Sequence, residues 1–393
     1  MRLLHTSDWH LGRSFHREGM LTHQAAYVDH LVEVVRAEQV DVVLVAGDVY
    51  DRALPPVDAV RLADEALVRL AAEGVTVVVS SGNHDSAQRL GFSARLIEAA
   101  GVHLRTDLAR VGEPVLLEDR HGPVAVHPLP YLDPYAVAGA WSLDERSHAA
   151  ALGAAMSRVR ADLDARPGVR SVVTAHAFVA GAQPSDSERD ISVGGVERVP
   201  RPVFDGITYA ALGHLHGPHV LDDHLRYSGS PLAYSFSETD QVKGSWLVDL
   251  DAGGLASATF VPAPVPRPLA RLRGDLETLL GDPALAEHEG SWLEVALTDV
   301  RRPEQAMERL RERFPHTLLL SFDAVRPALG APPASRTHAR TDHDVAWEFM
   351  ADLGPDEPTD AERRLLWRAV DACCDDATAD PNAEASGPAE EGD

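Results

Sequence analysis

The first 260 residues alternate short runs of apolar, mostly β-branched residues with longer stretches in which apolar residues recur every three or four positions. The runs predict buried strands, and the stretches predict helices that pack one face on a sheet. The predicted strands are Leu3–Thr6, Val42–Ala46, Thr76–Ser80, Ser171–Ala175 and Ile207–Leu212, with antiparallel strands at Ser245–Leu250 and Ala258–Val261, and the predicted helices are Gln24–Arg36 and Val57–Leu70. This pattern is typical of a layered α/β domain with mixed sheets.

Prolines divide the rest of the chain. The segment Val261–Pro268 has four prolines in eight residues, so we expect a linker there and a first domain over residues 1–262. Residues 269–326 show a strand, helix, strand, helix, strand pattern, which predicts a compact αβ module. A second linker, Pro327–Ala334, follows this module.

Two amphipathic helices are predicted near the end of the chain, Asp344–Leu353 and Ala361–Ala372, within a segment that spans residues 342–374. Thr359 or Asp360 can cap the second helix. The pair carries more apolar surface than two isolated helices can hide, so it either docks on the main body or binds a partner. Residues 375–393 are acidic and predict a disordered tail.

Composition and charge narrow the function. The net charge is −25, and residues 371–393 hold eight acidic residues and no Lys or Arg. This balance argues against a free-standing nucleic-acid binder, because phosphate contacts need clustered cations. The adjacent Cys373 and Cys374 are the only cysteines, so a disulfide framework or zinc finger is excluded and a reducing cytosol is expected. No apolar run is long enough for a membrane span or a signal peptide.

Polar motifs follow several of the predicted strands. Asp8 and His10 come after the first strand, Asp48 after the second, and Gly82-Asn83-His84-Asp85 after the third. His176 follows Ser171–Ala175, and Gly213-His214-Leu215-His216 follows Ile207–Leu212. Ligands of open α/β sheets bind beyond the carboxyl ends of the strands, so we expect these side chains to meet in one cleft.

The donors in these motifs are carboxylates, an amide and imidazoles, with no thiolate. The candidate metal ligands are Asp8, His10, Asp48, Asn83, His176, His214 and His216. Such hard donors favour Mn²⁺, with Mg²⁺, Fe²⁺ or Zn²⁺ as competitors. Seven ligands are too many for one ion that must keep open positions, so two ions sharing a carboxylate are expected, about 3.5–4 Å apart.

The series of motifs resembles that of the calcineurin-like metallophosphoesterases over about residues 1–260. Within them, the segments Met1–Gly12, Val45–Asp51, Ala211–His216 and Tyr227–Pro231 resemble the SbcD-type DNA nuclease subunits. The resemblance extends over nearly the whole chain. It implies a layered phosphoesterase sandwich over residues 1–262, a capping domain over 269–326 and a partner-binding helix pair over 342–374.

The resemblance also implies roles for single residues. One Mn²⁺ would be held by Asp8, His10, Asp48 and His216, and the other by Asp48, Asn83, His176 and His214, with Asp48 as the bridge. His84 matches the catalytic histidine that binds no metal. Archaeal relatives have a histidine three residues after the bridging aspartate, where this chain has Asp51. A DNA-contact role is therefore not carried over to that position.

The implied activity is Mn²⁺-dependent hydrolysis of DNA, as exonuclease and endonuclease, by a two-metal mechanism. The implied partners are an SbcC-type ATPase, bound through residues 342–374, and a second copy of the chain, bound through the phosphoesterase domain. Together they would process DNA ends and hairpins in the cytoplasm for repair, recombination and replication. Because ligand histidines must be neutral, we expect activity to fall below about pH 6.5.

Two alternatives stay open: a stand-alone phosphatase or cyclic-nucleotide phosphodiesterase, and a non-catalytic scaffold. The 130 residues after the phosphoesterase domain count against the first alternative, and the complete set of ligands counts against the second. Among other polar residues, His5 and Trp9 are expected in the core. Arg13, Arg17, His16 and His23 are expected on the solvated surface, although they could meet DNA. Two interpretations of Ser185–Asp190 stay open: the segment contributes to the active site or to the side that faces DNA, or it is a plain surface loop.

Overall fold

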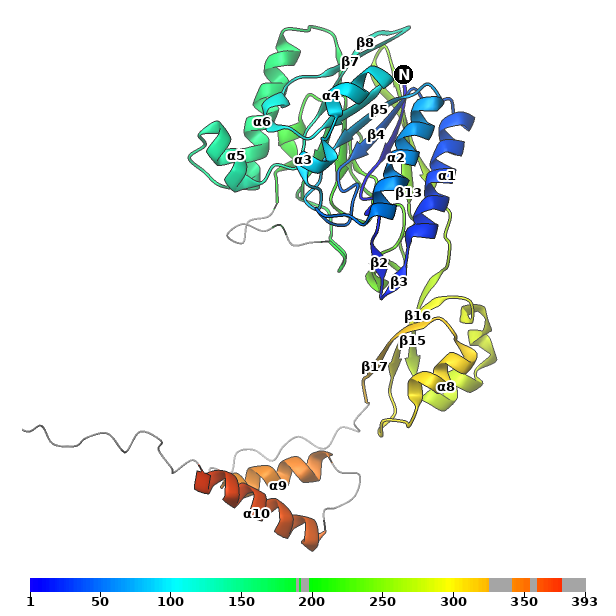
Figure 1. Ribbon diagram of the computed structural model, residues 1–393, viewed down its shortest axis with the longest axis vertical. Coiled ribbons are helices and arrows are strands. Elements are labelled where there is room, and N and C mark those ends of the chain that lie inside the picture. The colour runs from blue at the N-terminus through cyan, green and yellow to red at the C-terminus, as the bar shows by residue number, and fades with distance from the viewer. Residues whose placement is uncertain (189–190, 192–197, 325–340, 354–358, 377–393) are drawn as a thin grey trace, which may run out of the picture. The chain divides into compact units, whose positions relative to one another are not determined.

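The computed structural model describes residues 1–188, 191, 198–324, 341–353 and 359–376 (Figure 1). The first sheet has six strands in the order β14 (Gly254–Pro262), β13 (Gly244–Asp251), β1 (Arg2–Thr6), β4 (Val42–Ala46), β5 (Thr76–Ser80) and β6 (Val102–Arg105). Neighbours from β1 to β6 are parallel, whereas β13 and β14 are antiparallel. The predicted mixed sheet is therefore confirmed.

A second six-stranded sheet, also mixed, faces the first. Its order is β11 (His219–Asp222), β12 (Leu225–Tyr227), β10 (Tyr209–Gly213), β9 (Arg170–His176), β8 (Gly122–Pro128) and β7 (Val115–Asp119). The strands β8, β9, β10 and β12 run parallel to one another, whereas β7 runs antiparallel to β8 and β11 runs antiparallel to β12. A short ribbon pairs β2 (Ser14–Phe15) with β3 (Glu18–Gly19).

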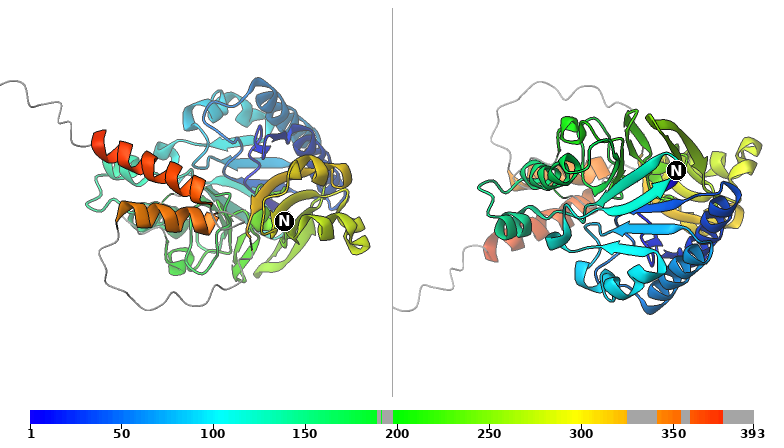
Figure 2. Two further views of the ribbon diagram at one scale, coloured as in Figure 1. Left: turned by 90° about the horizontal axis from the view of Figure 1, so that it is seen from below. Right: turned by 90° about the horizontal axis from the view of Figure 1, so that it is seen from above.

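Helices cover the outer faces of both sheets (Figures 1 and 2). The helices of this part are α1 (Leu21–Ala37), α2 (Val57–Ala72), α3 (Ala87–Leu90), α4 (Ala94–Ile97), α5 (Pro134–Trp141) and α6 (His148–Asp164). α1 and α2 pack on the first sheet, and α6 packs on the second. The layers therefore run helix, sheet, sheet, helix.

Successive side chains of a central strand point to opposite faces of the sheet, and the burial of both faces explains why the predicted runs are continuously apolar. In β4, Val43 and Val45 pack toward α1 and α2. Val42 and Leu44 pack toward the second sheet, against residues such as Val172. Because both faces of the strand are buried, each position needs an apolar side chain. Every predicted strand and helix of the first domain is present, with ends shifted by at most a few residues.

The region after residue 262 has the predicted order of elements. A three-stranded sheet has the order β15 (Leu269–Gly274), β16 (Trp292–Leu297) and β17 (Thr317–Phe322). Along the chain, helix α7 (Leu276–Gly281) follows β15, and helix α8 (Ala306–Arg313) follows β16. The predicted linker Pro327–Ala334 lies outside the described residues, as does the predicted tail from residue 377 onward. Residues 375 and 376, expected in that tail, end the last helix instead.

The helix pair consists of α9 (Asp342–Leu353) and α10 (Asp360–Asp376). The Arg363 guanidinium lies over the Trp347 ring at 5.0 Å and over the Trp367 ring at 4.6 Å, which joins the two helices. Thr359 caps α10: its hydroxyl accepts the backbone N–H of Glu362, whose carboxylate in turn accepts the backbone N–H of Thr359 at 2.7 Å. Within the described ranges, no helix has the length and apolarity needed to span a bilayer.

Candidate metal centre

The candidate ligands come from five strand ends in the two facing sheets. Asp8 and His10 follow β1, Asp48 follows β4 and Asn83 follows β5 in the first sheet. In the second sheet, His176 ends β9, and His214 and His216 follow β10. The structure brings their donor atoms together in overlapping groups, Asp8 with His10 and His216, and Asp8 with Asp48 and His176. Each of these five side chains is buried.

The backbone at the centre turns sharply. Residues with φ in the left-handed region include Asp8 (53°), His10 (46°), Asp48 (51°) and His214 (101°). Asp and His are among the residue types that tolerate this conformation, although it costs free energy. The loops after β1 and β4 are tied together, since the Asp8 N–H donates to Gly47 O at 3.1 Å and the His10 N–H donates to Asp48 O at 3.0 Å.

Two glycines allow the loops to approach each other. A Cβ on Gly47, where φ is 90°, would collide with the His176 ring, and a Cβ on Gly82 would collide with the Asp48 carboxylate. Both glycines are therefore needed for close packing around the ligands, and Gly47 is needed for the left-handed turn as well.

Asp48 lies between histidines from both sheets. Its Oδ2 is 3.4 Å from His176 Nε2 and 3.7 Å from His10 Nε2. His176 Nδ1 lies 3.0 Å from Ala46 O, so this nitrogen carries a proton and donates it to the carbonyl. The other nitrogen of His176, Nε2, is then directed toward Asp48 and Asn83.

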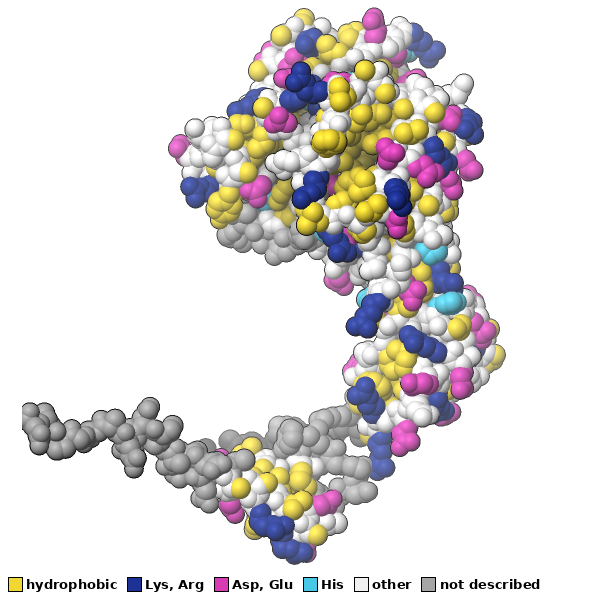
Figure 3. Space-filling view, in the orientation of Figure 1, with side chains coloured by type: hydrophobic (Ala, Val, Ile, Leu, Met, Phe, Trp, Pro, Cys, Tyr) yellow, Lys and Arg dark blue, Asp and Glu magenta, His cyan; other side chains and the backbone are white. Residues whose placement is uncertain are grey.

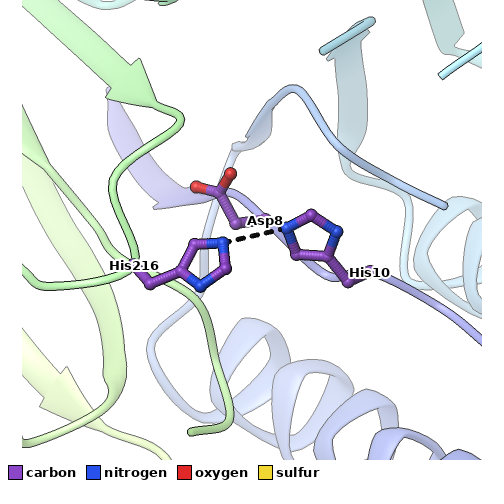
Figure 4. Close-up of side chains that lie close together, drawn as sticks. All are labelled: Asp8, His10 and His216. Atoms are coloured by element: carbon purple, nitrogen blue, oxygen red, sulfur yellow. Dashed lines mark hydrogen bonds between the residues drawn. The ribbon is translucent and has the colours of Figure 1, made fainter. Parts of the chain in front are cut away.

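His10 and His216 face each other across the centre, below Asp8 in the close-up view (Figure 4). Their Nε2 atoms are 3.0 Å apart. Two imidazole nitrogens at this distance need one proton between them to form a hydrogen bond. A cation bound by both lone pairs can take the place of that proton.

Asn83 and His214 complete the cluster. Asn83 Oδ1 lies 2.8 Å from His176 Nε2 and 3.3 Å from His214 Nδ1. The Asn83 amide nitrogen is buried and has no hydrogen-bond partner among the described residues. The backbone N–H of His214 donates to the Asp8 carboxylate at 3.1 Å, which links the second sheet to the first.

This geometry can be compared with known families. The calcineurin-like phosphoesterase model matches residues 1–218, which is more than half of the chain. The chain belongs to the calcineurin-like phosphoesterase family. A second family model, SbcD_C, described as the type 5 capsule protein repressor C-terminal domain, matches residues 265–352. The two matches together are consistent with an SbcD-type nuclease subunit.

Solved structures give only distant likenesses. A dimetal phosphatase from Danio rerio is 13% identical, with 67% of this chain and 99% of that chain covered and a TM-score of 0.41. TT1561 of Thermus thermophilus is 12% identical, with 66% and 98% covered and a TM-score of 0.38. The GAP50 anchor of the inner membrane complex of Plasmodium is 12% identical, with 84% and 99% covered and a TM-score of 0.40. The family assignment rests on the family models.

The donor set of this calcineurin-like phosphoesterase fits divalent ions. It combines two buried carboxylates, one amide oxygen and four imidazoles, and the contact between His10 Nε2 and His216 Nε2 suits a cation. Burial lowers the pKa values of His10 and His214 well below their ordinary range, so both imidazoles are neutral and can coordinate. A metal-dependent hydrolase is therefore supported by both family and site.

His84 lies beside these side chains and forms a third group of possible donors with His10 and Asp48. Its Nδ1 is 2.6 Å from the backbone oxygen of Asp51, and its Nε2 is 4.0 Å from Asp48 Oδ2. The ring contacts His10 edge-on, with centroids 4.7 Å apart. Asp51 thus contacts His84 through its backbone, and its own carboxylate lies 3.9 Å from His10 Nδ1.

The expected core residues are confirmed. Trp9 is buried and donates its indole N–H to Thr6 at 3.0 Å. His5 is buried between Tyr209 and the backbone of Leu212. Arg13, expected on the solvated surface, is instead only 17% exposed, and its guanidinium lies 4.9 Å from the Tyr234 ring centroid.

Several residues around His216 lie outside the predicted ligand set. Ser187 and Glu188 belong to the segment for which the sequence left an active-site role open, whereas Glu238 and Lys243 were not predicted. Glu188 accepts the His216 backbone N–H at 2.7 Å, and the Ser187 hydroxyl contacts His216 Nδ1. Behind them, the buried Glu238 pairs with Lys243 at 2.5 Å. The segment Ser185–Glu188 therefore reaches the centre, whereas residues 189 and 190 of the predicted loop lie outside the described residues.

We expect metal affinity to depend on pH through His176 and Asp8. Burial opposes a charge on His176, but the nearby Asp48 carboxylate outweighs it and raises the pKa of His176 to about 9. Burial raises the pKa of Asp8 to about 6. Both groups must lose a proton to coordinate. The apparent Mn²⁺ affinity should therefore fall about tenfold per unit as pH drops below 9, and more steeply below 6.

Isothermal titration calorimetry between about pH 6 and pH 8, in buffers of different ionisation enthalpy, measures both the affinity and the protons released. The variant His176→Gln should release one proton fewer. An affinity that is independent of pH over this range would contradict the assignment.

Proposed function

We propose that this chain is the nuclease subunit of an SbcCD-type complex, a Mn²⁺-dependent DNA exonuclease and endonuclease. The observation that carries the proposal is the joining of two features in one chain. A buried cluster of hard donors lies within the phosphoesterase match, and a C-terminal region matches the SbcD_C model. Its task would be processing of DNA ends and hairpins during repair, recombination and replication, in the cytoplasm.

We further propose that the cluster holds two ions. Asp8, His10, Asp48 and His216 would bind one, and Asp48, Asn83, His176 and His214 would bind the other. The buried position of Asp48 between His10 and His176 supports its role as the bridge. Mn²⁺ is proposed because the set mixes carboxylate, amide and imidazole donors, and Mg²⁺ or another divalent ion could replace it.

When bound, two such ions activate water and stabilise the attacking and leaving oxygens of a phosphodiester during displacement. The contribution of His84 follows from its hydrogen bond. Nδ1 donates to Asp51 O, so Nε2 is the nitrogen that faces the centre. A protonated His84 would then present an N–H at Nε2 to the leaving oxygen.

The variant His84→Gln tests this role together with the substrate class. Because the ligands are untouched, it should keep wild-type Mn²⁺ binding while losing about 10²–10⁴-fold in turnover of a blunt DNA duplex. The same enzyme should hydrolyse bis(p-nitrophenyl) phosphate much more slowly than DNA. Rates are measured at saturating Mn²⁺, with Asp48→Asn as the control that loses metal.

A wild-type rate in His84→Gln with full metal content would remove His84 from the mechanism. A wild-type chain that cleaves the small diester and leaves DNA ends intact, with and without the ATPase, would favour the stand-alone phosphodiesterase instead.

The helix pair is the proposed binding site for an SbcC-type ATPase. Val345 on α9 is 52% exposed, and Leu365 and Trp367 on α10 are 61% and 38% exposed, so the helix pair presents several apolar side chains that a partner could cover. An ATPase bound here would also supply the cations that a chain with a net charge of −25 lacks for binding DNA.

Loss of this surface should release the ATPase. Leu365→Glu places a charge in the proposed interface, so it should reduce co-purification of a co-expressed SbcC-type ATPase by at least tenfold, as should removal of residues 342–393. Mn²⁺ binding should be unchanged in both variants. Leu116→Glu, at another exposed apolar residue, is the control, and a complex that persists in the truncated chain would contradict the assignment.

We also propose a homodimer through the phosphoesterase domain. Figure 3 shows hydrophobic side chains gathered on the face that carries α2 and α4, where Val57 is 66%, Phe92 79% and Leu96 78% exposed. Phe92→Glu should shift the wild-type dimer to monomer in sedimentation velocity, whereas Leu116→Glu should leave it dimeric. A monomeric wild-type chain at micromolar concentration would contradict the proposal.

A further inference from the structure

The segment Ser185–Glu188 is held against the metal centre from three sides. The Arg13 guanidinium donates to Ser187 O at 2.8 Å, and the Asp186 N–H donates to the Ser237 hydroxyl at 2.9 Å. Glu188 accepts the backbone N–H of His216 at 2.7 Å. These contacts join four separate parts of the chain, so the place of Ser187 is fixed by the fold and does not depend on its own side chain.

Behind Ser187 lies a buried ion pair. The Glu238 side chain is fully buried and lies 2.5 Å from the Lys243 ammonium. Lys243 also donates to His216 O at 2.8 Å. A buried carboxylate paired with an ammonium is ionised and can only accept hydrogen bonds. The Ser187 hydroxyl contacts this carboxylate more closely than it contacts Ser185 Oγ, which lies 3.0 Å away, so its proton is directed to Glu238.

The direction of this hydrogen bond determines the next one. Since the Ser187 proton is directed to Glu238, the same oxygen meets His216 Nδ1 with a lone pair. His216 Nδ1 must then carry the proton and donate it to Ser187. The remaining nitrogen, Nε2, has its lone pair directed at the centre, 3.0 Å from His10 Nε2.

We propose that Ser187 is a positioning residue of the metal centre, which relays the hydrogen bond of His216 to the ion pair of Glu238 and Lys243. The relay selects the one tautomer of His216 that can coordinate through Nε2 and holds its ring in place. Partners of this kind typically change metal affinity by about 10–100-fold in metalloproteins. This inference rests on the proposed metal centre but does not depend on the substrate being DNA.

Removing the hydroxyl tests the relay. Ser187→Ala leaves His216 Nδ1 and the Glu238 carboxylate without their shared partner, so the affinity for one of two Mn²⁺ ions should fall about 10–100-fold in calorimetric titration. Ser187→Thr keeps the hydroxyl and should restore the affinity to within about threefold. Hydrolysis of bis(p-nitrophenyl) phosphate by Ser187→Ala should recover at high Mn²⁺, because the defect lies in binding.

Ser237→Ala is the matched control. The Ser237 hydroxyl accepts the Asp186 N–H and so holds the same segment, but it has no hydrogen bond to His216 or Glu238 among the described residues. Its affinity for Mn²⁺ should stay within about threefold of wild type. If both alanine variants lose the same affinity, loosening of the segment explains the result and the relay is wrong.

The tautomer itself gives a second readout. In metal-free protein labelled with ¹⁵N-histidine, long-range proton–nitrogen NMR should show His216 protonated at Nδ1 in the wild type and a mixture of tautomers in Ser187→Ala. An unchanged tautomer and unchanged affinity in Ser187→Ala would overturn the inference. A wild-type chain that binds fewer than two ions would instead overturn the proposed metal centre.

Discussion

Two carboxylates buried where two sheets meet impose the main constraint on this fold. Asp8 and Asp48 are almost inaccessible to water, and an unpaired buried charge is costly. The opposite sheet supplies compensation, since His176 lies 3.4 Å from Asp48 and the His214 backbone donates to Asp8. The close approach of the sheets, the glycines between them and the imidazoles at their edge all follow from this need.

Much of the fold could be predicted from the pattern of apolar residues. Strands such as β4 are buried on both faces, so they appear in the sequence as continuous apolar runs. Strands β6, β7, β8, β11 and β12 and helices α5 and α6 were not predicted. In β7, the apolar Leu116 is exposed beside the buried Val115, so the sequence does not alternate with burial, and α6 carries little apolar contrast between its faces because alanines and arginines share it. Local patterns of this kind are weak, and packing against neighbours decides the structure.

The candidate ligands could be found because each follows a strand, and strand ends of parallel sheets converge. The residues that support them were harder to find. Ser187 lies in a segment for which the sequence left an active-site role open. Glu238 and Lys243 contact the region of His216 from a short 3-10 helix and from the residue before β13, and nothing in their local sequence indicates a buried ion pair. Arg13 was misplaced for the same reason, since its position depends on Tyr234 and on the chain 174 residues away.

The left-handed backbone at Asp8, His10, Asp48 and His214 limits how this centre can be redesigned. At these positions, a replacement must suit the turn as well as the ion, which favours Asn and disfavours β-branched or bulky side chains. Asn83, His176 and His216 lie on ordinary backbone. An engineer who wishes to change the preferred cation has more chemical freedom at these three positions, where altering a donor does not also disturb a strained loop.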